Sequence, residues 1–313
     1  MSQKLILLIN PYCHQGRGWK KWLAIKSGVS RFLPNATEIV TEKGTDLAVQ
    51  LQPHLNNNER TCIVSAGGDG SIHYLVNNVM QTKNIQREKL TIGAIGIGSS
   101  NDFLKPFRTF INRIPVRINI DQPARWHDLG KVIRTDTNNN TQQKFFIVNA
   151  SFGATAHGNW NFNNPGTVLR WLKKQNTSMA ITYAAISTIL TFKNDDCNIC
   201  YNGKVNRIAV SNINLLKIPF VSGSLHYNQD ILPDDGYFGL NICSGMNRAE
   251  LLQTLFSLEN GKFEQDRKKT SLFVDRFQLE SATPVVFECD GETEKVTAVD
   301  ISIAPKAIQV LAN

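Results

Sequence analysis

The chain has 313 residues, of which 42% are apolar and 19% charged, and its formal net charge is +8. This composition is typical of a globular protein and excludes an intrinsically disordered or fibrous one, while the length favours two domains over one. The positive charge predicts attraction to anions. Because the basic residues are scattered in small groups, we expect no nucleic-acid partner.

Roughly the first 120 residues alternate strand-like and helix-like runs. This alternation predicts a three-layer α/β domain over residues 1–124, with a mostly parallel sheet. The loops that leave the carboxyl ends of such strands gather at one edge of the sheet, where ligands bind. The expected strands are Leu5–Ile9, Thr37–Val40, Cys62–Ser65 and Thr91–Ile95, and the expected helices are Trp19–Phe32, Thr45–Leu55 and Ile72–Met80.

The third of these strands runs directly into a glycine-rich segment made of Gly67, Gly68, Asp69, Gly70 and Ser71. Glycines let backbone N–H groups approach an anion closely, and the helix that follows adds its positive end. We therefore predict a phosphate-binding loop rather than a plain turn. Asp69 would repel a phosphate, so it must act through Mg²⁺, through water or by holding the loop.

A second loop of the same design follows the next strand and contains Gly98, Ser99, Asn101 and Asp102. It offers backbone donors, hydroxyls and an amide for further phosphate or ribose contacts. It is not a dinucleotide fingerprint, because Asn101 stands where the third glycine would be. The sequence also contains no Walker A motif, which excludes a P-loop NTPase.

After about residue 125 the chain becomes rich in short strand-like runs. They predict a second, mainly antiparallel domain over residues 125–302. The alternating run Ala298–Leu311 predicts a pair of closing strands. The other expected strands are Lys144–Ala150, Asn198–Tyr201, Arg207–Asn212, Tyr237–Ile242 and Val285–Cys289, and the expected helices are Leu169–Phe192 and Arg248–Leu258.

The distribution of apolar residues and cysteines predicts a cytoplasmic chain. The apolar run at the N-terminus is too short for a signal peptide, and Met179–Phe192 is too short to span a membrane. The six cysteines lie far apart and mostly in strand-like runs, which indicates reduced, buried thiols. Cys197 and Cys200 form a lone CxxC without the further ligands that a structural zinc site needs.

Several segments, in the same order along the chain, resemble the diacylglycerol kinase catalytic-domain family, which includes sphingosine kinases and the soluble bacterial lipid kinases. Each motif is short, but together they cover essentially the whole chain. The matching segments are Asn10-Pro11 with Gly16 and Gly18, Gly67–Ser71 (the family's GGDGT), Gly98–Asp102 (its G-T-x-N-D), Pro233–Phe238, Asp290-Gly291-Glu292 and Ala304–Ala307.

The resemblance implies an α/β nucleotide-binding domain and a β-sandwich lipid domain, with the C-terminal strand 303–313 returning to the first. It implies transfer of the ATP γ-phosphate to a lipid hydroxyl, with diacylglycerol as the first expectation. The cofactors would be ATP and Mg²⁺. Such an enzyme would associate peripherally with the inner face of the membrane to reach its lipid. The sequence says nothing of oligomeric state.

The resemblance also assigns roles to individual residues. Asn10, Thr41 and both glycine loops would contact the nucleotide. Glu292 would be the general base, supported by Asp69 and Asp290 as further catalytic carboxylates. Asp235, with the carbonyls of Leu232 and Tyr237, would hold a structural Mg²⁺, although the same residues could form a plain hairpin turn.

Three departures from the family pattern keep alternatives open. His73-Tyr74 stands where the family has Asn-Glu after the first loop, Gly96 replaces a proline, and Thr155 replaces an acid in the segment that lines the acceptor cleft. A kinase for a small soluble acceptor, related to the NAD kinases, is one alternative. A non-catalytic lipid- or nucleotide-binding module is the other.

Overall fold

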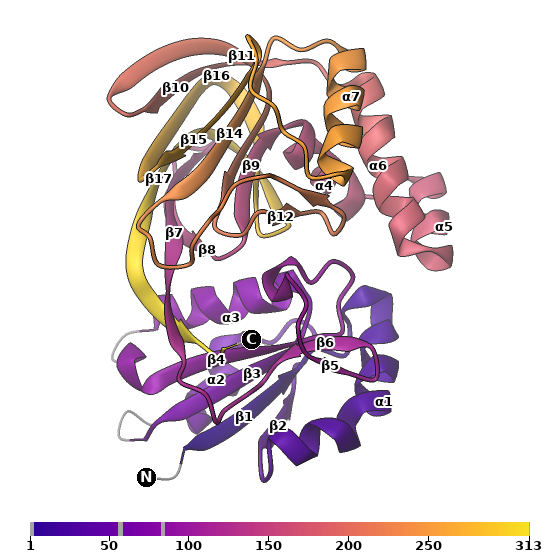
Figure 1. Cartoon of the computed structure of the whole chain (residues 1–313), viewed down its shortest axis with the longest axis vertical. Helices are drawn as coiled ribbons and strands as arrows, with labels where there is room; N and C mark the ends of the chain where they lie inside the picture. The colour runs from indigo at the N-terminus through magenta and orange to yellow at the C-terminus, as the bar shows by residue number, and fades with distance from the viewer. Residues whose placement is uncertain (1–2, 56–58, 83–84, 313) are drawn as a thin grey trace. The chain divides into compact units, whose positions relative to one another are not determined.

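A computed structural model describes residues 3–55, 59–82 and 85–312. The chain forms two compact units, and each is described by itself below (Figure 1). Unit 1 comprises Met1–Leu129 together with Pro305–Asn313, and unit 2 is Gly130–Ala304. The second unit is therefore an insertion in the first, because the chain leaves unit 1 once and returns to it once.

The predicted parallel sheet is present in unit 1. Its strands lie in the order β2-β1-β3-β4, all parallel, and the end of β17 pairs in parallel with β4. A short antiparallel strand, β6, also pairs with β4, and β5 pairs with β6. The strand bounds are β1 Lys4–Ile9, β2 Thr37–Val40, β3 Thr61–Gly67, β4 Leu90–Gly96, β5 Phe110–Ile111 and β6 Ile114–Arg117.

Strands β3 and β4 are buried along their whole length, which explains why their sequences are nearly continuous apolar runs. Helix α1 covers part of the sheet with Trp22, Ile25 and Val29, which pack in one core with Leu7 and Val64. The helices of this unit are α1 Arg17–Phe32, α2 Leu47–Leu51 and α3 Asp69–Gln81, with 3-10 turns at His14–Gly16, Gln52–His54, Arg87–Lys89 and Asp102–Leu104.

Unit 2 is rich in antiparallel strands, in the order β15-β14-β11-β10-β16-β17. Strand β9 pairs with both β11 and β16, and β7 with β8. Phe152, Phe238, Phe277 and Phe287 are fully buried in its core. The bounds are β7 Arg125–Asp136, β8 Thr141–Phe146, β9 Asn149–Gly153, β10 Asp195–Tyr201, β11 Lys204–Leu216, β12 Phe220–Val221, β13 Leu225–His226, β14 Phe238–Ser244, β15 Lys269–Val274, β16 Arg276–Cys289 and β17 Glu292–Val310.

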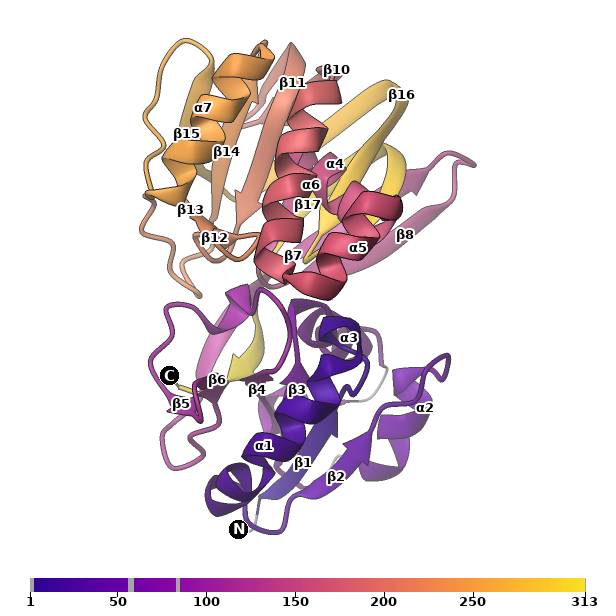
Figure 2. The same ribbon diagram turned by 90° about the vertical axis from the view of Figure 1, so that its right-hand side faces the viewer.

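The helices of unit 2 differ from the prediction of one helical stretch over Leu169–Phe192. The chain breaks there at Asn176, whose side chain accepts a hydrogen bond from Met179 N at 3.2 Å and so starts a new helix. Helices α5, α6 and α7 lie on one side of the strands of this unit (Figure 2). The bounds are α4 Ala154–Asn163, α5 Thr167–Gln175, α6 Thr177–Thr191 and α7 Arg248–Glu259.

The predicted pair of closing strands at Ala298–Leu311 is wrong, because a single strand, β17, runs from Glu292 to Val310. Its first part pairs with β16 in unit 2, and Gln309 and Val310 pair with β4 in unit 1. The strand changes partners without a break. In the described part of the chain, no helix combines the length and the apolar character needed to cross a bilayer.

Candidate active site

The two predicted glycine loops meet in unit 1, because they follow neighbouring parallel strands. Gly67 and Gly96 are paired in the sheet, and Gly98 N donates a hydrogen bond to Gly67 O at 2.9 Å. The loop backbones then pass so closely that a Cβ atom added to Gly98 would lie 2.3 Å from Gly68 Cα. Only glycine fits this approach, so the paired loops present backbone rather than side chains.

Asn10 joins the first loop from the end of β1. Its Nδ2 donates to Ser71 Oγ at 2.9 Å, and its Oδ1 accepts from Tyr12 N at 3.0 Å. The serine that replaces the family's threonine thus keeps a working hydroxyl. Thr41 follows β2, and its backbone N donates to Ile9 O at 2.8 Å. The ends of β1, β2 and β3 therefore bring these predicted residues to one edge of the sheet.

Asp69 links the two loops. Its Oδ1 accepts a hydrogen bond from Phe103 N at 3.0 Å, and Phe103 belongs to the 3-10 turn after the second loop. Of the roles left open for Asp69, this contact favours holding the loops together. Helix α3 begins at Asp69, and no side chain caps it in the structure, so its positive end faces the loop.

The second loop contains a buried side-chain oxygen that has no hydrogen-bond partner among the described residues. Asn101 adopts a left-handed conformation with φ 56°, and its Nδ2 donates to Gly96 O at 3.1 Å. Its Oδ1 is buried and accepts no hydrogen bond in the structure. Asp102 is buried as well and forms an ion pair with Lys105 at 2.6 Å, whereas Ser99 is exposed. The buried amide oxygen is thus available to a donor from a ligand.

Two further observations on unit 1 concern residues around the loops. Lys21, on α1, donates to Gly98 O at 3.0 Å, and burial lowers its pKa. Sequence reasoning missed this lysine, since a lysine on a helix has no distinguishing pattern.

Where the family has Asn-Glu, His73 is buried and Tyr74 is 57% exposed, so no carboxylate replaces the missing glutamate at that place.

In unit 2, Asp290 lies in a nest of backbone donors. Its Oδ1 accepts from Val148 N at 2.9 Å and Asn149 N at 3.1 Å, and its Oδ2 accepts from Ile147 N at 3.1 Å. The residue is 3% exposed. A carboxylate so fully engaged is suited to fixing the chain around it rather than to taking a proton from a substrate.

Asp290 and Gly291 form the tight turn between β16 and β17, with φ of 48° and 89°. Both values are positive, as a two-residue hairpin of this kind requires. The turn presents Glu292, the predicted base, as the first residue of β17. Glu292 is half-buried, and Asn163 on α4 steadies the turn by donating to Gly291 O at 2.8 Å.

Glu288 lies beneath this turn and was missed by sequence reasoning. It accepts hydrogen bonds from Asn149 Nδ2 at 2.9 Å, from Ser151 Oγ and from Gly291 N. Burial raises the pKa of Glu288 to about 7, although these hydrogen bonds oppose the shift. An acid inside the apolar run Val285–Cys289 was the only signal available.

The predicted metal ligands Leu232, Asp235 and Tyr237 come together, but around an ammonium group. Lys217 Nζ lies 3.2 Å from Leu232 O, 3.2 Å from Asp235 Oδ1 and 2.9 Å from Tyr237 O. A divalent ion at the same place would overlap the lysine, so the residues as arranged do not fit one. No cluster of three or more His, Cys, Asp or Glu that could hold a metal is found among the described residues.

The segment that would line the acceptor cleft, Ser151–Ala156, joins the end of β9 to α4. Thr155, which replaces the family's acid, donates its N–H to Asn212 Oδ1 at 2.8 Å. Asn214, also on β11, donates to Tyr227 Oη at 2.8 Å inside the unit. These buried amides are polar groups that sequence reasoning did not single out.

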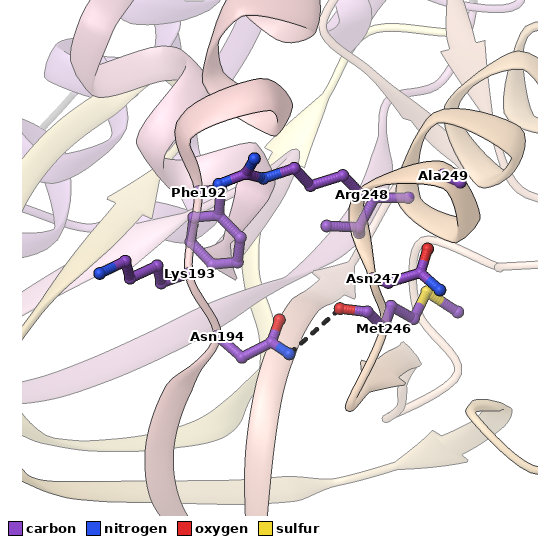
Figure 3. A pocket seen from close by; sticks show the side chains of 8 residues that line it. Phe192, Lys193, Asn194, Met246, Asn247, Arg248 and Ala249 are labelled. Carbon is purple, nitrogen blue, oxygen red and sulfur yellow. Dashed lines mark hydrogen bonds between the residues drawn. The ribbon is translucent and has the colours of Figure 1, made fainter.

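A separate pocket of about 600 Å³ lies at the start of α7 (Figure 3). Asn194 Nδ2 donates to Met246 O at 3.1 Å across it. Asn247 and Glu250 cap the helix reciprocally, which satisfies the backbone amides of these two residues. None of the predicted site residues lines this pocket.

Two family models match the chain. The diacylglycerol kinase catalytic domain model matches residues 4–132, and the YegS C-terminal NAD kinase beta sandwich-like domain model matches residues 162–312. The resemblance predicted from the sequence is confirmed, because residues 4–132 match the diacylglycerol kinase catalytic domain. This match supports a phosphotransferase.

Individual proteins are also similar to this chain. The chain is 24% identical to "Sphingoid long chain base kinase 4" of Schizosaccharomyces pombe, over 97% of this chain and 74% of that protein. A crystal structure of a diacylglycerol kinase from Bacillus anthracis has a TM-score of 0.68 at 16% identity, covering 99% and 97% of the two chains. Yeast NADH kinase complexed with NADH has a TM-score of 0.52 at 11% identity, covering 99% and 83%. At such identities the structural likeness concerns the fold alone.

Proposed function

We propose that this protein transfers the γ-phosphate of ATP to the hydroxyl group of a membrane lipid. The observation that carries the proposal is the close approach of the loops Gly67–Ser71 and Gly98–Asp102 at the ends of neighbouring strands. Two glycine loops that expose backbone at one sheet edge are suited to triphosphate. A plain pair of turns would not require Gly98 to be free of a side chain.

Three features of unit 1 fit ATP. A Cβ would fill the cradle at Gly98, the buried Asn101 Oδ1 lacks a donor, and the positive end of α3 carries no side-chain cap. A nucleotide supplies an anion for the loops and helix and hydroxyl or amino donors for the amide oxygen. Mg²⁺ would arrive with the donor substrate as Mg-ATP and offset the phosphate charge.

In the proposed reaction, Glu292 accepts the proton of the lipid hydroxyl as its oxygen bonds to the γ-phosphorus. The bond between that phosphorus and the β–γ bridging oxygen breaks, and ADP leaves with the electron pair. A positioned general base contributes about 10²–10⁴-fold. Asp290 and Glu288 hold the turn that presents Glu292, through the hydrogen bonds to residues 147–151 and to Gly291.

Diacylglycerol is the first acceptor to test. A sphingoid base is the second, because the curated relative is named for that substrate. Likeness to the NADH kinase structure keeps a soluble dinucleotide acceptor as a third arm, and the missing glutamate at Tyr74 keeps a non-catalytic module as the outcome if no acceptor is phosphorylated.

We further propose that α5 and α6 rest on the membrane during lipid capture. Residues 154–194 contain no Asp or Glu but four basic residues, Arg170, Lys173, Lys174 and Lys193. Trp171 is 60% exposed and Met179 58% exposed on these helices. Exposed apolar side chains on a segment that carries basic but no acidic residues favour an anionic lipid surface.

The decisive experiment measures phosphate transfer from radiolabelled Mg-ATP to diacylglycerol, sphingosine or NAD⁺ in separate reactions. Phosphorylation of either lipid but not of NAD⁺ would support the proposal. Thermal shift with Mg-ATP tests nucleotide binding independently, since a bound ligand raises the melting temperature. If Mg-ATP at millimolar concentration neither shifts the folded protein nor labels any acceptor, the kinase proposal fails.

A further inference from the structure

The turn Leu232–Tyr237 in unit 2 is organised around a buried lysine. The side chain of Lys217 is 2% exposed, and that of Asp235 is 19% exposed. Asp235 also accepts hydrogen bonds from Leu232 N at 3.2 Å and from Tyr237 N at 3.0 Å. The carboxylate shapes the turn, and the turn directs two carbonyl oxygens and one carboxylate oxygen at the ammonium.

The geometry matches an ammonium group. A lysine has three N–H donors, and Leu232 O, Asp235 Oδ1 and Tyr237 O supply three acceptors at 2.9–3.2 Å. These are hydrogen-bond lengths. Mg²⁺ would require oxygens at about 2.0–2.1 Å in near-octahedral geometry and would retain several waters. One carboxylate balances one ammonium charge, but it would leave a divalent ion half compensated.

We infer that the Lys217 ammonium is a built-in cation that takes the place of a bound metal ion in this turn. The protein then needs no divalent ion to order Leu232–Tyr237. This inference concerns the stability of unit 2 and does not depend on the proposed reaction.

Lys217 also connects this turn to the acidic turn of the candidate site. It is the first residue after β11, and its backbone N donates to Val148 O at 2.9 Å. The N–H of the same Val148 donates to Asp290 Oδ1. The backbone around Val148 therefore lies between the internal cation and Asp290, so a disturbance at Lys217 is expected to reach the turn that holds Glu292.

The test compares melting temperatures of the full-length protein in EDTA and in millimolar Mg²⁺, without nucleotide. Wild type should melt at the same temperature in both, and dialysed wild type should contain no stoichiometric divalent metal. Lys217→Ala should melt at least about 5 °C lower in EDTA, because it leaves a partly buried carboxylate and two carbonyls without a cation. Since the alanine opens space beside the oxygens, Mg²⁺ should restore part of the loss.

Two variants control this result. Lys268→Ala removes a lysine paired at 2.7 Å with Glu250 at the surface of the same unit, and its melting temperature should stay near that of wild type. Asp235→Asn combined with Lys217→Ala should abolish the Mg²⁺ rescue. The inference would be overturned if the wild type bound a divalent metal, or melted at a temperature that depended on one, and Asp235→Asn removed this effect. A Lys217→Ala protein as stable in EDTA as wild type would overturn it too. If Lys217→Ala does not fold, the wild-type measurements still decide.

Discussion

Replacing Asp290 with asparagine separates a structural carboxylate from a catalytic one. In the wild type, both carboxylate oxygens accept backbone N–H groups, from Ile147, Val148 and Asn149. An asparagine oxygen in the place of Oδ1 could keep two of these bonds, but its NH₂ group would then face Ile147 N. The variant thus loses one charge-assisted bond to a buried donor, worth about 1.5–3 kcal/mol, and weakens two others.

The summed cost of Asp290→Asn is about 3–5 kcal/mol, or a melting temperature lower by about 6–20 °C for a unit of this size. Thermal unfolding followed by circular dichroism measures the shift. Glu292→Gln is the matched variant. Among the described residues, no hydrogen bond of the Glu292 side chain shapes the turn, so the variant should melt within about 2 °C of wild type. Its lipid-phosphorylating rate should nevertheless fall at least about 10²-fold, at unchanged Mg-ATP affinity.

The opposite pattern would refute this reasoning. Suppose that Asp290→Asn melts like wild type and loses at least about 10²-fold in turnover. Asp290 then takes part in the chemistry, and its hydrogen bonds to the backbone are not its main role. If Glu292→Gln keeps most of its rate, Glu292 is not the base.

Three further predictions concern the loops, the buried acid and the exposed helices. Gly98→Ala places a Cβ against Gly68 Cα and should abolish the rise in melting temperature that Mg-ATP causes, whereas Gly166→Ala, with open space around it, should retain this rise. A normal response of Gly98→Ala would contradict nucleotide binding between the two glycine loops. Burial raises the pKa of Glu288 from about 4.5 to about 7, so the folded state binds a proton more tightly than the unfolded state, and the free energy of unfolding should fall by about 3 kcal/mol as pH rises through that window. Glu288→Gln should lack this pH dependence, and the same pH dependence of melting temperature in both proteins would refute the assignment. Trp171→Ser should reduce sedimentation with anionic vesicles, and binding of the wild type to these vesicles should weaken as salt is added. Equal binding of the wild type to neutral and anionic vesicles at all ionic strengths would count against an electrostatic contribution.

The sequence predicted the structure best where the same physical requirement fixes both the residue types and the local conformation. Apolar runs that end in glycines predicted β3 and β4 and the loops after them, because a strand buried on both faces must be apolar and a close backbone approach must be glycine. The break at Asn176 could also have been foreseen, since Asn before a helical run is a capping signal.

The remaining features depend on contacts between residues distant in sequence. Lys217 follows an apolar strand as any surface lysine does, and only the fold places it against a turn about fifteen residues later. Glu288 is set apart from an ordinary strand residue by the hydrogen bonds that it accepts from Asn149 and Ser151, which lie far away in the sequence. Periodicity likewise could not show that β17 changes partners, because alternation reports which face is buried and not which strand lies beside it.

The insertion of unit 2 within unit 1 has a consequence for synthesis. The ribosome releases most of unit 1 first, yet Thr91 and Ile92 of β4 lack their partners on that edge until Gln309 and Val310 emerge. Leu311, which belongs to the core of unit 1, emerges later still. At about 5–20 residues per second, synthesis of Gly130–Ala304 takes roughly 9–35 s. The unit made first is therefore completed last, with an open strand edge in the meantime, and a truncation of the C-terminus would damage the N-terminal unit.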